Sequence, residues 1–304
     1  MKYGIPYMGS KNSIAKEIVD LLPTAECFVD LFCGGCAITH AAMLSGKYKR
    51  FIINDIDPQM PRLFVDAING KYRNEKRWIS RDDFERLKDT DTYVRTCWSF
   101  GNGGYNYMYG RKIEAWKKAL HYARVLGDFS LLKRDFGIVT DDASRQNIRL
   151  NAEKWGLIDK LKCSMEGLQG LQSLERLESL ERLQSNLQVF SSDYQSVEIP
   201  ADSCVYCDPP YKGTSEYKYG GFDYLRFYDW LRTRDFPVYV SEYAMPEDFV
   251  AVWQKTKICT FSSRNNAKYT VERVFVHERF VDDVRRKISG QPELFEKSGE
   301  AVAI

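Results

Sequence analysis

Short apolar runs alternate with polar or glycine-rich turns along much of the chain, and several runs have the length of buried strands. Strands are predicted at 27–32, 51–55, 187–190, 203–207, 238–242 and 271–276. Apolar residues three and four positions apart predict helices over 12–22, about 37–44 and 111–126. Because strands alternate with helices, the pattern favours an α/β fold with a doubly wound, mostly parallel sheet.

The first predicted strand opens into a glycine-rich turn at Gly34-Gly35. A helix follows, and then a second strand that ends in Asn54-Asp55. Strand, glycine turn, helix, strand and acid follow one another in this order in nucleotide-binding α/β units. The acid at the second strand end can accept hydrogen bonds from both hydroxyls of a ribose. This region therefore predicts a nucleotide or nucleoside site.

A second motif, Asp208-Pro209-Pro210-Tyr211, follows the strand predicted at 203–207. The prolines fix φ and restrict the residues before them, so the backbone carbonyls point in set directions. This motif places a carboxylate, rigid carbonyl groups and an aromatic ring at the carboxyl end of a strand. Such a site suits a planar base with an exocyclic amine. Asp and Pro are also ordinary turn residues, so the tetrapeptide alone leaves a simple turn open.

The composition of the chain limits the possible classes of protein but does not by itself indicate a reaction. The chain has 304 residues with 44 basic and 42 acidic side chains, so a nucleic-acid partner would show only in local patches. No run of 18 apolar residues or signal-peptide core occurs, which predicts a cytoplasmic protein without a membrane span. Two Cys-x-x-Cys pairs, Cys33/Cys36 and Cys204/Cys207, have zinc-ligand spacing. Both lie at predicted strand ends beside better-explained motifs, so no metal is expected.

Residues 61–165 differ in character, because basic and aromatic residues interleave there. Lys117 and Lys118 belong to a second basic group in this region, and Phe100 to Tyr109 supply aromatics between the two groups. Such interleaving suits a nucleic-acid surface, although a solvated helical insertion explains it equally well. Leucines then recur every third residue over 166–185. A helix advances 300° in three residues, so this row drifts around an α-helix, and stacked turns, a short buried helix or a linker stay open.

Taken together, five motifs resemble those of the DNA adenine-N6 methyltransferases of the Dam type, including phage-like members, and they keep that family's order. They are Tyr7 to Lys11, Asp30 to Cys36, Asn54 to Asp57, Asp193-Tyr194 and Asp208 to Tyr211. One departure is Cys36, which stands where the family usually has a further glycine. The resemblance implies a Rossmann-like doubly wound methyltransferase sheet from 1–60 and 186–286. It also implies an inserted, mostly helical target-recognition domain at 61–165, the leucine repeat at 166–185 and a tail at 287–304.

By this resemblance the cofactor is S-adenosyl-L-methionine, and the product is S-adenosyl-L-homocysteine. The methionine end would lie against Tyr7 and Lys11, the ribose against Asp55, and the adenine against Asp193 and Tyr194. The resemblance adds to the cofactor site Asp30, Phe32, Gly34 and Asp208. The catalytic residues implied are Asp208, Pro209, Pro210 and Tyr211. Asp208 and the carbonyl group of Pro209 would accept the two N–H bonds of an adenine amine, and Tyr211 would stack on the base. The base must flip out of the duplex to reach them.

Double-stranded DNA is the implied partner. The residues predicted to bind it are Lys71, Arg73, Lys76, Arg77, Arg111, Lys112, Lys212 and Tyr217. The last two lie in a glycine-rich loop, 212–222, that is predicted to close over the substrate. In the tail, Gln291 to Phe295 resembles the peptide by which bacterial enzymes dock on the replication sliding clamp.

Three other functions compete with adenine methylation. Cytosine-N4 methylation makes similar demands on the site, and a catalytically silent DNA-binding relative would keep the same fold. Methylation of a protein glutamine amide is disfavoured, because related enzymes usually carry Asn in place of Asp208. A bacterial or phage-encoded protein with a role in restriction–modification, phage protection or regulation is compatible with the resemblance.

Overall fold

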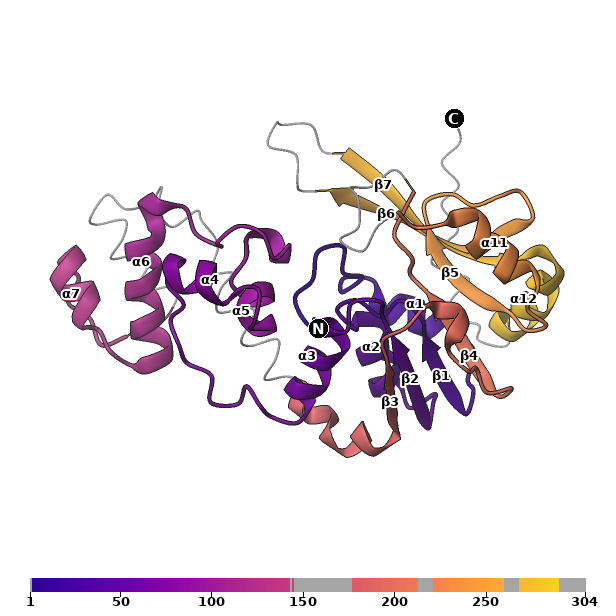
Figure 1. The fold of residues 1–304 in the computed structure, drawn as a ribbon, viewed down its shortest axis with the longest axis horizontal. Helices are drawn as coiled ribbons and strands as arrows, with labels where there is room; N and C mark the ends of the chain where they lie inside the picture. Colours follow the sequence, from indigo (N-terminus) through magenta and orange to yellow (C-terminus); the bar gives the residue numbers. More distant parts are fainter. Residues whose placement is uncertain (1, 143, 145–176, 213–220, 260–267, 290–304) are drawn as a thin grey trace. The chain divides into compact units, whose positions relative to one another are not determined.

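The computed structural model describes residues 2–142, 144, 177–212, 221–259 and 268–289 (Figure 1). The chain divides into two compact units. The first comprises Met1–Gly4, Ser10–Arg62 and Leu180–Ile304, and the second comprises Ile5–Gly9 and Leu63–Ser179.

A seven-stranded sheet forms the first unit, with the order β3-β2-β1-β4-β5-β7-β6. Five strands run parallel: β1 (Cys27–Asp30), β2 (Arg50–Asn54), β3 (Leu187–Phe190), β4 (Ser203–Cys207) and β5 (Val238–Glu242). Two are antiparallel: β7 (Lys268–His277) pairs with β5 and with β6 (Phe249–Cys259). Strand order reverses at β1, which lies between β2 and β4, and such a switch point is where open α/β sheets bind ligands. The predicted Rossmann-like sheet is confirmed, whereas β6 was missed.

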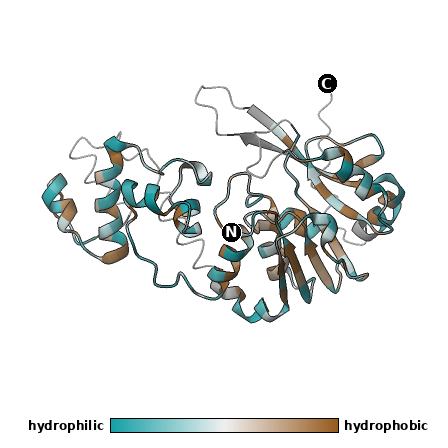
Figure 2. Ribbon diagram, viewed as in Figure 1, coloured by the Kyte–Doolittle hydropathy of each residue, from teal (hydrophilic) through white to brown (hydrophobic). Residues whose placement is uncertain are grey.

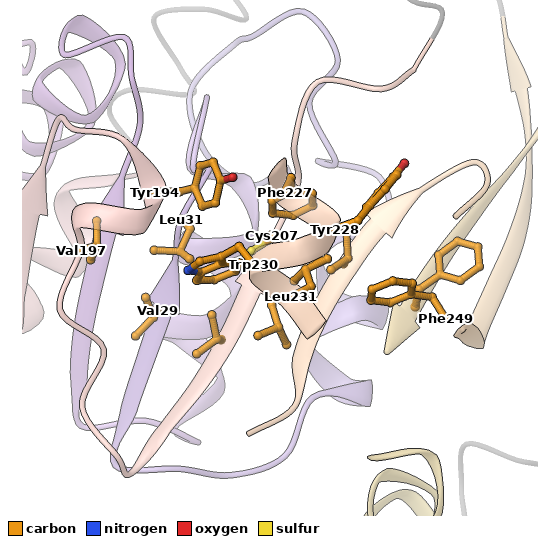
Figure 3. Packing of buried hydrophobic residues seen from close by; sticks show 14 of the residues in the cluster. Val29, Leu31, Tyr194, Val197, Cys207, Phe227, Tyr228, Trp230, Leu231 and Phe249 are labelled. Carbon is orange, nitrogen blue, oxygen red and sulfur yellow. The ribbon is translucent and has the colours of Figure 1, made fainter. Parts of the chain in front are cut away.

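The central strands are buried along nearly their whole length, as expected for parallel strands covered on both faces. Figure 2 shows that their residues are largely hydrophobic. One face packs against α11 (Tyr224–Arg232). Figure 3 shows this cluster, in which Phe227 and Trp230 of the helix are buried together with Val29 of β1 and with Leu31, which directly follows β1. This cluster holds the carboxyl ends of β1 and β4 in a rigid setting.

Two further helices of the first unit are α1 (Ala15–Leu21) and α2 (Ala37–Ser45), both close to the predicted ranges. Lys47 ties them together, since its ammonium donates to the carbonyl groups of Val19, Asp20 and Leu22 at 2.8–2.9 Å. These are carbonyls at a helix end, which lack partners within the helix. The remaining elements are η4 (Tyr194–Ser196), η5 (Glu278–Phe280) and α12 (Val281–Ser289).

Helices dominate the described part of the second unit. They are α3 (Gln59–Ile68, which begins in the first unit), α4 (Arg81–Leu87), α5 (Thr92–Cys97), η1 (Phe100–Asn102), α6 (Arg111–His121), the π-helical turn η2 (Tyr122–Leu126) and α7 (Ser130–Phe136). Trp116 and Leu120 of α6 pack on Leu132 of α7 in a small core. The predicted helix over 111–126 is thus observed as α6 and η2.

Only the end of the leucine repeat lies within the described residues. There the chain forms a 3-10 helix, η3 (Glu178–Asn186). A 3-10 helix has three residues per turn, so leucines three positions apart share one side instead of drifting around the axis. Leu177 and Leu180 are fully buried and Leu183 is half-buried. The argument from α-helical drift was therefore wrong for this part of the repeat.

Candidate active site

Asn54, the last residue of β2, joins three strand ends. Its Nδ2 donates to the carbonyl groups of Leu31 and Ser192 at 3.0 Å, and its Oδ1 accepts from the amide of Ser192 at 3.0 Å. The segments that follow β1 and β3 are thereby fixed beside β2. The side chains that these segments carry lie together at the carboxyl edge of the sheet.

Asp55 joins the glycine-rich turn to the end of β2. Its Oδ2 accepts from the amide of Gly34 at 2.7 Å, and its Oδ1 accepts from the amide of Asp57 at 2.9 Å. Burial raises the pKa of Asp55 to about 6, although these two hydrogen bonds act in the opposite direction. A carboxylate has about four acceptor positions, so both oxygens can accept further hydrogen bonds.

Cys36 takes the left-handed backbone conformation that its place in the turn requires, with φ 54° and ψ 33°. Glycine adopts this region without strain, whereas other residues do so at a cost. The chain thus keeps the backbone of a glycine position while carrying a side chain there. Cys36 therefore departs from the family pattern without changing the conformation of the turn, but it adopts that conformation at an energetic cost.

Asp30, at the end of β1, is a buried carboxylate with an unused oxygen. Its Oδ2 accepts from the hydroxyl of Thr39 at 2.7 Å, whereas Oδ1 makes no hydrogen bond within the described residues. Burial raises the pKa of Asp30 to about 7, and the charges of Asp208 and Asp55 act in the same direction. A buried, incompletely paired carboxylate favours a bound cation.

An aromatic cavity of about 250 Å³ opens beside these strand ends. The rings of Phe32, Tyr194 and Phe222 lie 5.4–6.2 Å apart and form its apolar side. Its polar side carries predicted cofactor residues, and its lining also contains one residue of the Pro-Pro motif. These lining residues include Asn54, Asp55, Asp193 and Pro210. Phe222 was missed, because it lies outside every motif.

Arg226 of α11 also lines the cavity and was not predicted from the sequence. It pairs with the carboxylate of Asp193 at 2.9 Å and contacts Gln195 at 2.6 Å. Its position orients Asp193 at the mouth of the cavity.

Next to the cavity, the Asp-Pro-Pro-Tyr motif follows β4 as predicted. The ammonium of Lys11 lies 2.8 Å from Oδ1 of Asp208 and 4.4 Å from the centre of the Tyr211 ring. Burial lowers the pKa of Lys11, but the charges of Asp208 and Glu272 outweigh it and leave the pKa above its ordinary value. Burial likewise raises the pKa of Asp208, and Lys11 offsets that effect only in part.

Two glutamates complete this cluster, and sequence reasoning missed both as site residues. The hydroxyl of Tyr211 donates to Oε2 of Glu272, from β7, at 2.8 Å. Glu242, the last residue of β5, accepts from the amides of Lys212 and Tyr243 at 3.3 Å and 2.7 Å. Burial raises the pKa of Glu242 to about 7. The acidic end of β5 was a usable signal for Glu242, whereas Glu272 lies inside a strand and no motif marks it.

Some predicted site residues lie elsewhere. Tyr7 belongs to the second unit, whereas Lys11, Asp208 and Tyr211 belong to the first. Lys212 is exposed at the end of the motif. Tyr217 and the peptide Gln291 to Phe295 fall outside the described residues, as does most of the loop predicted to close over the substrate.

The six basic residues of the insertion that were predicted to bind DNA are all exposed. Lys71 pairs with Asp66 and Arg77 pairs with Glu75, each at 2.6 Å. Lys117 is different, because it is buried with its ammonium 5.6 Å from the centre of the Tyr109 ring. Including Lys117 in the second basic group was therefore wrong, since its side chain supports the fold of the insertion.

The described residues offer neither a metal site nor a membrane span. No group of His, Cys, Asp and Glu side chains in that part of the chain is placed to hold a metal ion. Six of its cysteines are buried and form no disulfide: Cys27, Cys33, Cys36, Cys97, Cys204 and Cys207. Among the helices of the same residues, none is both long and apolar enough to cross a membrane.

A seven-stranded sheet with acidic side chains and a Pro-Pro motif at its switch point defines the class of Rossmann-like methyltransferases. Residues 7–134 match the family of D12 class N6 adenine-specific DNA methyltransferases. This match spans less than half of the chain, and it supports a Dam-type enzyme that methylates the N6 amine of adenine in DNA. The match favours adenine over the cytosine alternative. No curated protein matches the chain.

Proposed function

We propose that S-adenosyl-L-methionine is the methyl donor and that it binds in the aromatic cavity and along the glycine-rich turn. The observation that carries this proposal is the continuity of the site. Pro210 of the catalytic motif lines the same cavity as Asp55, Asp193 and Tyr194. A donor bound there would hold its reactive end next to Asp208.

The residues present fit the chemistry of this donor. The rings of Phe32 and Tyr194 provide flat surfaces for the adenine, and Asp55 can accept from the ribose hydroxyls. The unused Oδ1 of Asp30 suits a cationic group. When bound, this cofactor supplies a methyl group that its sulfonium already activates. Lys11 is proposed to act at Asp208 rather than at the methionine end, because its ammonium is engaged there.

The role of the Asp-Pro-Pro-Tyr motif is to hold and activate the target amine. The lone pair of an adenine amine is delocalised into the ring, which makes the nitrogen a poor nucleophile. Asp208 and the carbonyl group of Pro209 accept its two N–H bonds, draw the nitrogen toward tetrahedral geometry and free the lone pair. Tyr211 stacks on the base. The gain comes from positioning and electrostatics.

Access to this site requires a flipped base, because the amine of a paired adenine is not reachable inside a duplex. Unpairing costs roughly a few kcal/mol, which contacts to the DNA backbone must offset. The exposed residues Lys76, Arg111 and Lys112 of the insertion are suited to contact phosphates. We propose double-stranded DNA of a bacterium or phage as the substrate, with docking to the sliding clamp through Gln291 to Phe295 as a separate prediction.

Calorimetric titration of the protein with S-adenosyl-L-methionine tests the assignment of the donor. Phe32→Ala removes one ring of the cavity and should weaken binding by about tenfold or more, since stacking on one ring contributes about 1–3 kcal/mol. Phe100→Ala is the matched control, because Phe100 is an exposed aromatic residue of the insertion. Absence of binding to the wild type, or equal binding by Phe32→Ala, would contradict the proposal.

A further inference from the structure

Glu272 lies within β7, an antiparallel strand that carries none of the predicted motifs. Its side chain is buried, and its Oε2 lies 3.9 Å from the ammonium of Lys11. The same oxygen accepts the hydroxyl of Tyr211 at 2.8 Å. The Lys11 ammonium therefore has two carboxylate neighbours, Asp208 at 2.8 Å and Glu272 at 3.9 Å.

The nearer contact competes with the proposed chemistry. Asp208 must accept an N–H of the target amine, and the Lys11 ammonium, 2.8 Å from its Oδ1, draws on the same carboxylate. Lys11 is itself buried, so its ammonium cannot leave Asp208 without a large desolvation cost unless another partner replaces that carboxylate. Glu272 is such a partner, because its Oε2 lies 3.9 Å from the ammonium, about one ångström beyond hydrogen-bonding distance.

We propose that Glu272 is a positioning residue that receives the Lys11 ammonium when the target amine binds to Asp208. This role rests on the proposed function of Asp208. The hydroxyl of Tyr211 holds the glutamate in place, and Lys11 stays protonated throughout. Asp208, Glu272 and Lys11 together carry one net negative charge, and Glu242, the third carboxylate of the cluster, adds to it when ionised. That charge faces the target nitrogen as it becomes positive during methyl transfer, which stabilises the transition state.

Single-turnover methylation of unmethylated plasmid DNA tests this role. Glu272→Gln keeps an oxygen that can accept the Tyr211 hydroxyl but removes the negative charge. The rate constant of methyl transfer should fall by about tenfold or more, as expected when a buried charge loses its partner. The dissociation constant for S-adenosyl-L-methionine should stay within about twofold, because the cofactor cavity is unchanged. Glu278→Gln, which changes an exposed glutamate of η5, should match the wild type.

Combining Glu272→Gln with a substitution of Lys11 distinguishes the proposed role of Glu272 from a general structural role. If Glu272 acts through the ammonium, Glu272→Gln should not slow transfer further in a Lys11→Met background. Equal slowing in both backgrounds, or a wild-type rate for Glu272→Gln, would overturn the proposal. If Lys11→Met shows no measurable transfer, a crystal structure with DNA and S-adenosyl-L-homocysteine decides. The Lys11 ammonium should then lie closer to Glu272 than to Asp208, and the opposite result would refute the role.

The proposed function is tested separately in the same assay. An inactive wild type would overturn the function and this role together. If the wild type is active and Glu272→Gln transfers methyl groups at the same rate, only the role of Glu272 is overturned.

Discussion

The ammonium of Lys11 and the carboxylate of Asp208 lie 2.8 Å apart, although they come from distant parts of the sequence. Lys11 precedes α1, and Asp208 follows β4. Their pairing joins the N-terminal motif to the catalytic motif in one buried cluster. The proposed site of methyl transfer thus combines residues that only the folded sheet brings together.

Ionisation of Asp30 should make stability depend on pH. Burial raises the pKa of Asp30 from its ordinary value of 3.8 to about 7 in the folded protein, so the unfolded chain loses this proton first as the pH rises. The contribution of protonated Asp30 to the free energy of unfolding is therefore fully present below about pH 4 and is lost between about pH 4 and 7. The free energy of unfolding of Asp30→Asn should rise relative to that of the wild type across that window, and the difference should stay constant above it.

Urea unfolding from pH 4.5 to 8 measures this difference. The control, Asp235→Asn, changes an exposed carboxylate and should show a difference that is flat with pH. A difference for Asp30→Asn that shrinks as the pH rises would mean that the sign of the effect is wrong.

Replacing Cys36 by glycine should stabilise the protein. The left-handed conformation at Cys36 costs a non-glycine residue roughly 1–2 kcal/mol, and glycine removes that cost. The unfolding free energy of Cys36→Gly should rise by about 1 kcal/mol, because the greater entropy of unfolded glycine offsets part of the gain. Ala41→Gly, inside α2, should instead lower it by about 1 kcal/mol. A loss of stability in Cys36→Gly would show that packing of the thiol outweighs the backbone strain.

Gly4 is expected to tolerate no side chain. Its amide donates to Nδ1 of His40 at 2.9 Å, and an added Cβ would lie 2.3 Å from the carbonyl oxygen of Gly35. Gly4→Ala should therefore destabilise the glycine-rich turn and weaken cofactor binding. Gly46→Ala is a matched control, because Gly46 has nearly the same φ but nothing within 4 Å of the added Cβ. Equal losses in unfolding experiments would mean that φ alone, and not the close approach, explains Gly4.

The basic insertion should carry a salt-dependent part of DNA binding. Arg111 and Lys112 are exposed at the start of α6. Changing both to glutamine should reduce the slope of log affinity against log salt by about two, because each phosphate contact contributes about 0.9. Lys16→Gln, an exposed lysine on α1, is the charge control. An unchanged slope, measured by fluorescence anisotropy over a salt series, would place the DNA contacts elsewhere.

Much of the fold was readable from the sequence, because the parallel strands are short apolar runs followed by polar residues. β1, β2, β4 and β5 follow this rule, and their carboxyl ends hold Asp30, Asp55, Asp208 and Glu242. Of the two antiparallel strands, β7 was predicted in part at 271–276, whereas β6 does not follow the rule, since polar and charged residues are interspersed in it. For that reason β6 was missed.

The contacts between the site residues were harder to predict from the sequence than the positions of those residues along the chain. The sequence indicated Lys11, Asp208 and Tyr211 separately, but the pairing of Lys11 with Asp208 depends on how the N-terminal segment returns to β4. Glu272 gave no signal, because a single acid inside a strand is as common on a solvated edge. Its contact with Tyr211 exists only because β7 is inserted between β5 and β6.

The most direct test of the account is transfer of a labelled methyl group from S-adenosyl-L-methionine to unmethylated DNA, with analysis of the modified nucleoside. The wild type and Asp235→Ala, whose changed side chain is exposed, should both form N6-methyladenine, and Asp208→Ala should form none. A product of N4-methylcytosine, or unchanged activity in Asp208→Ala, would contradict the assignment of this site.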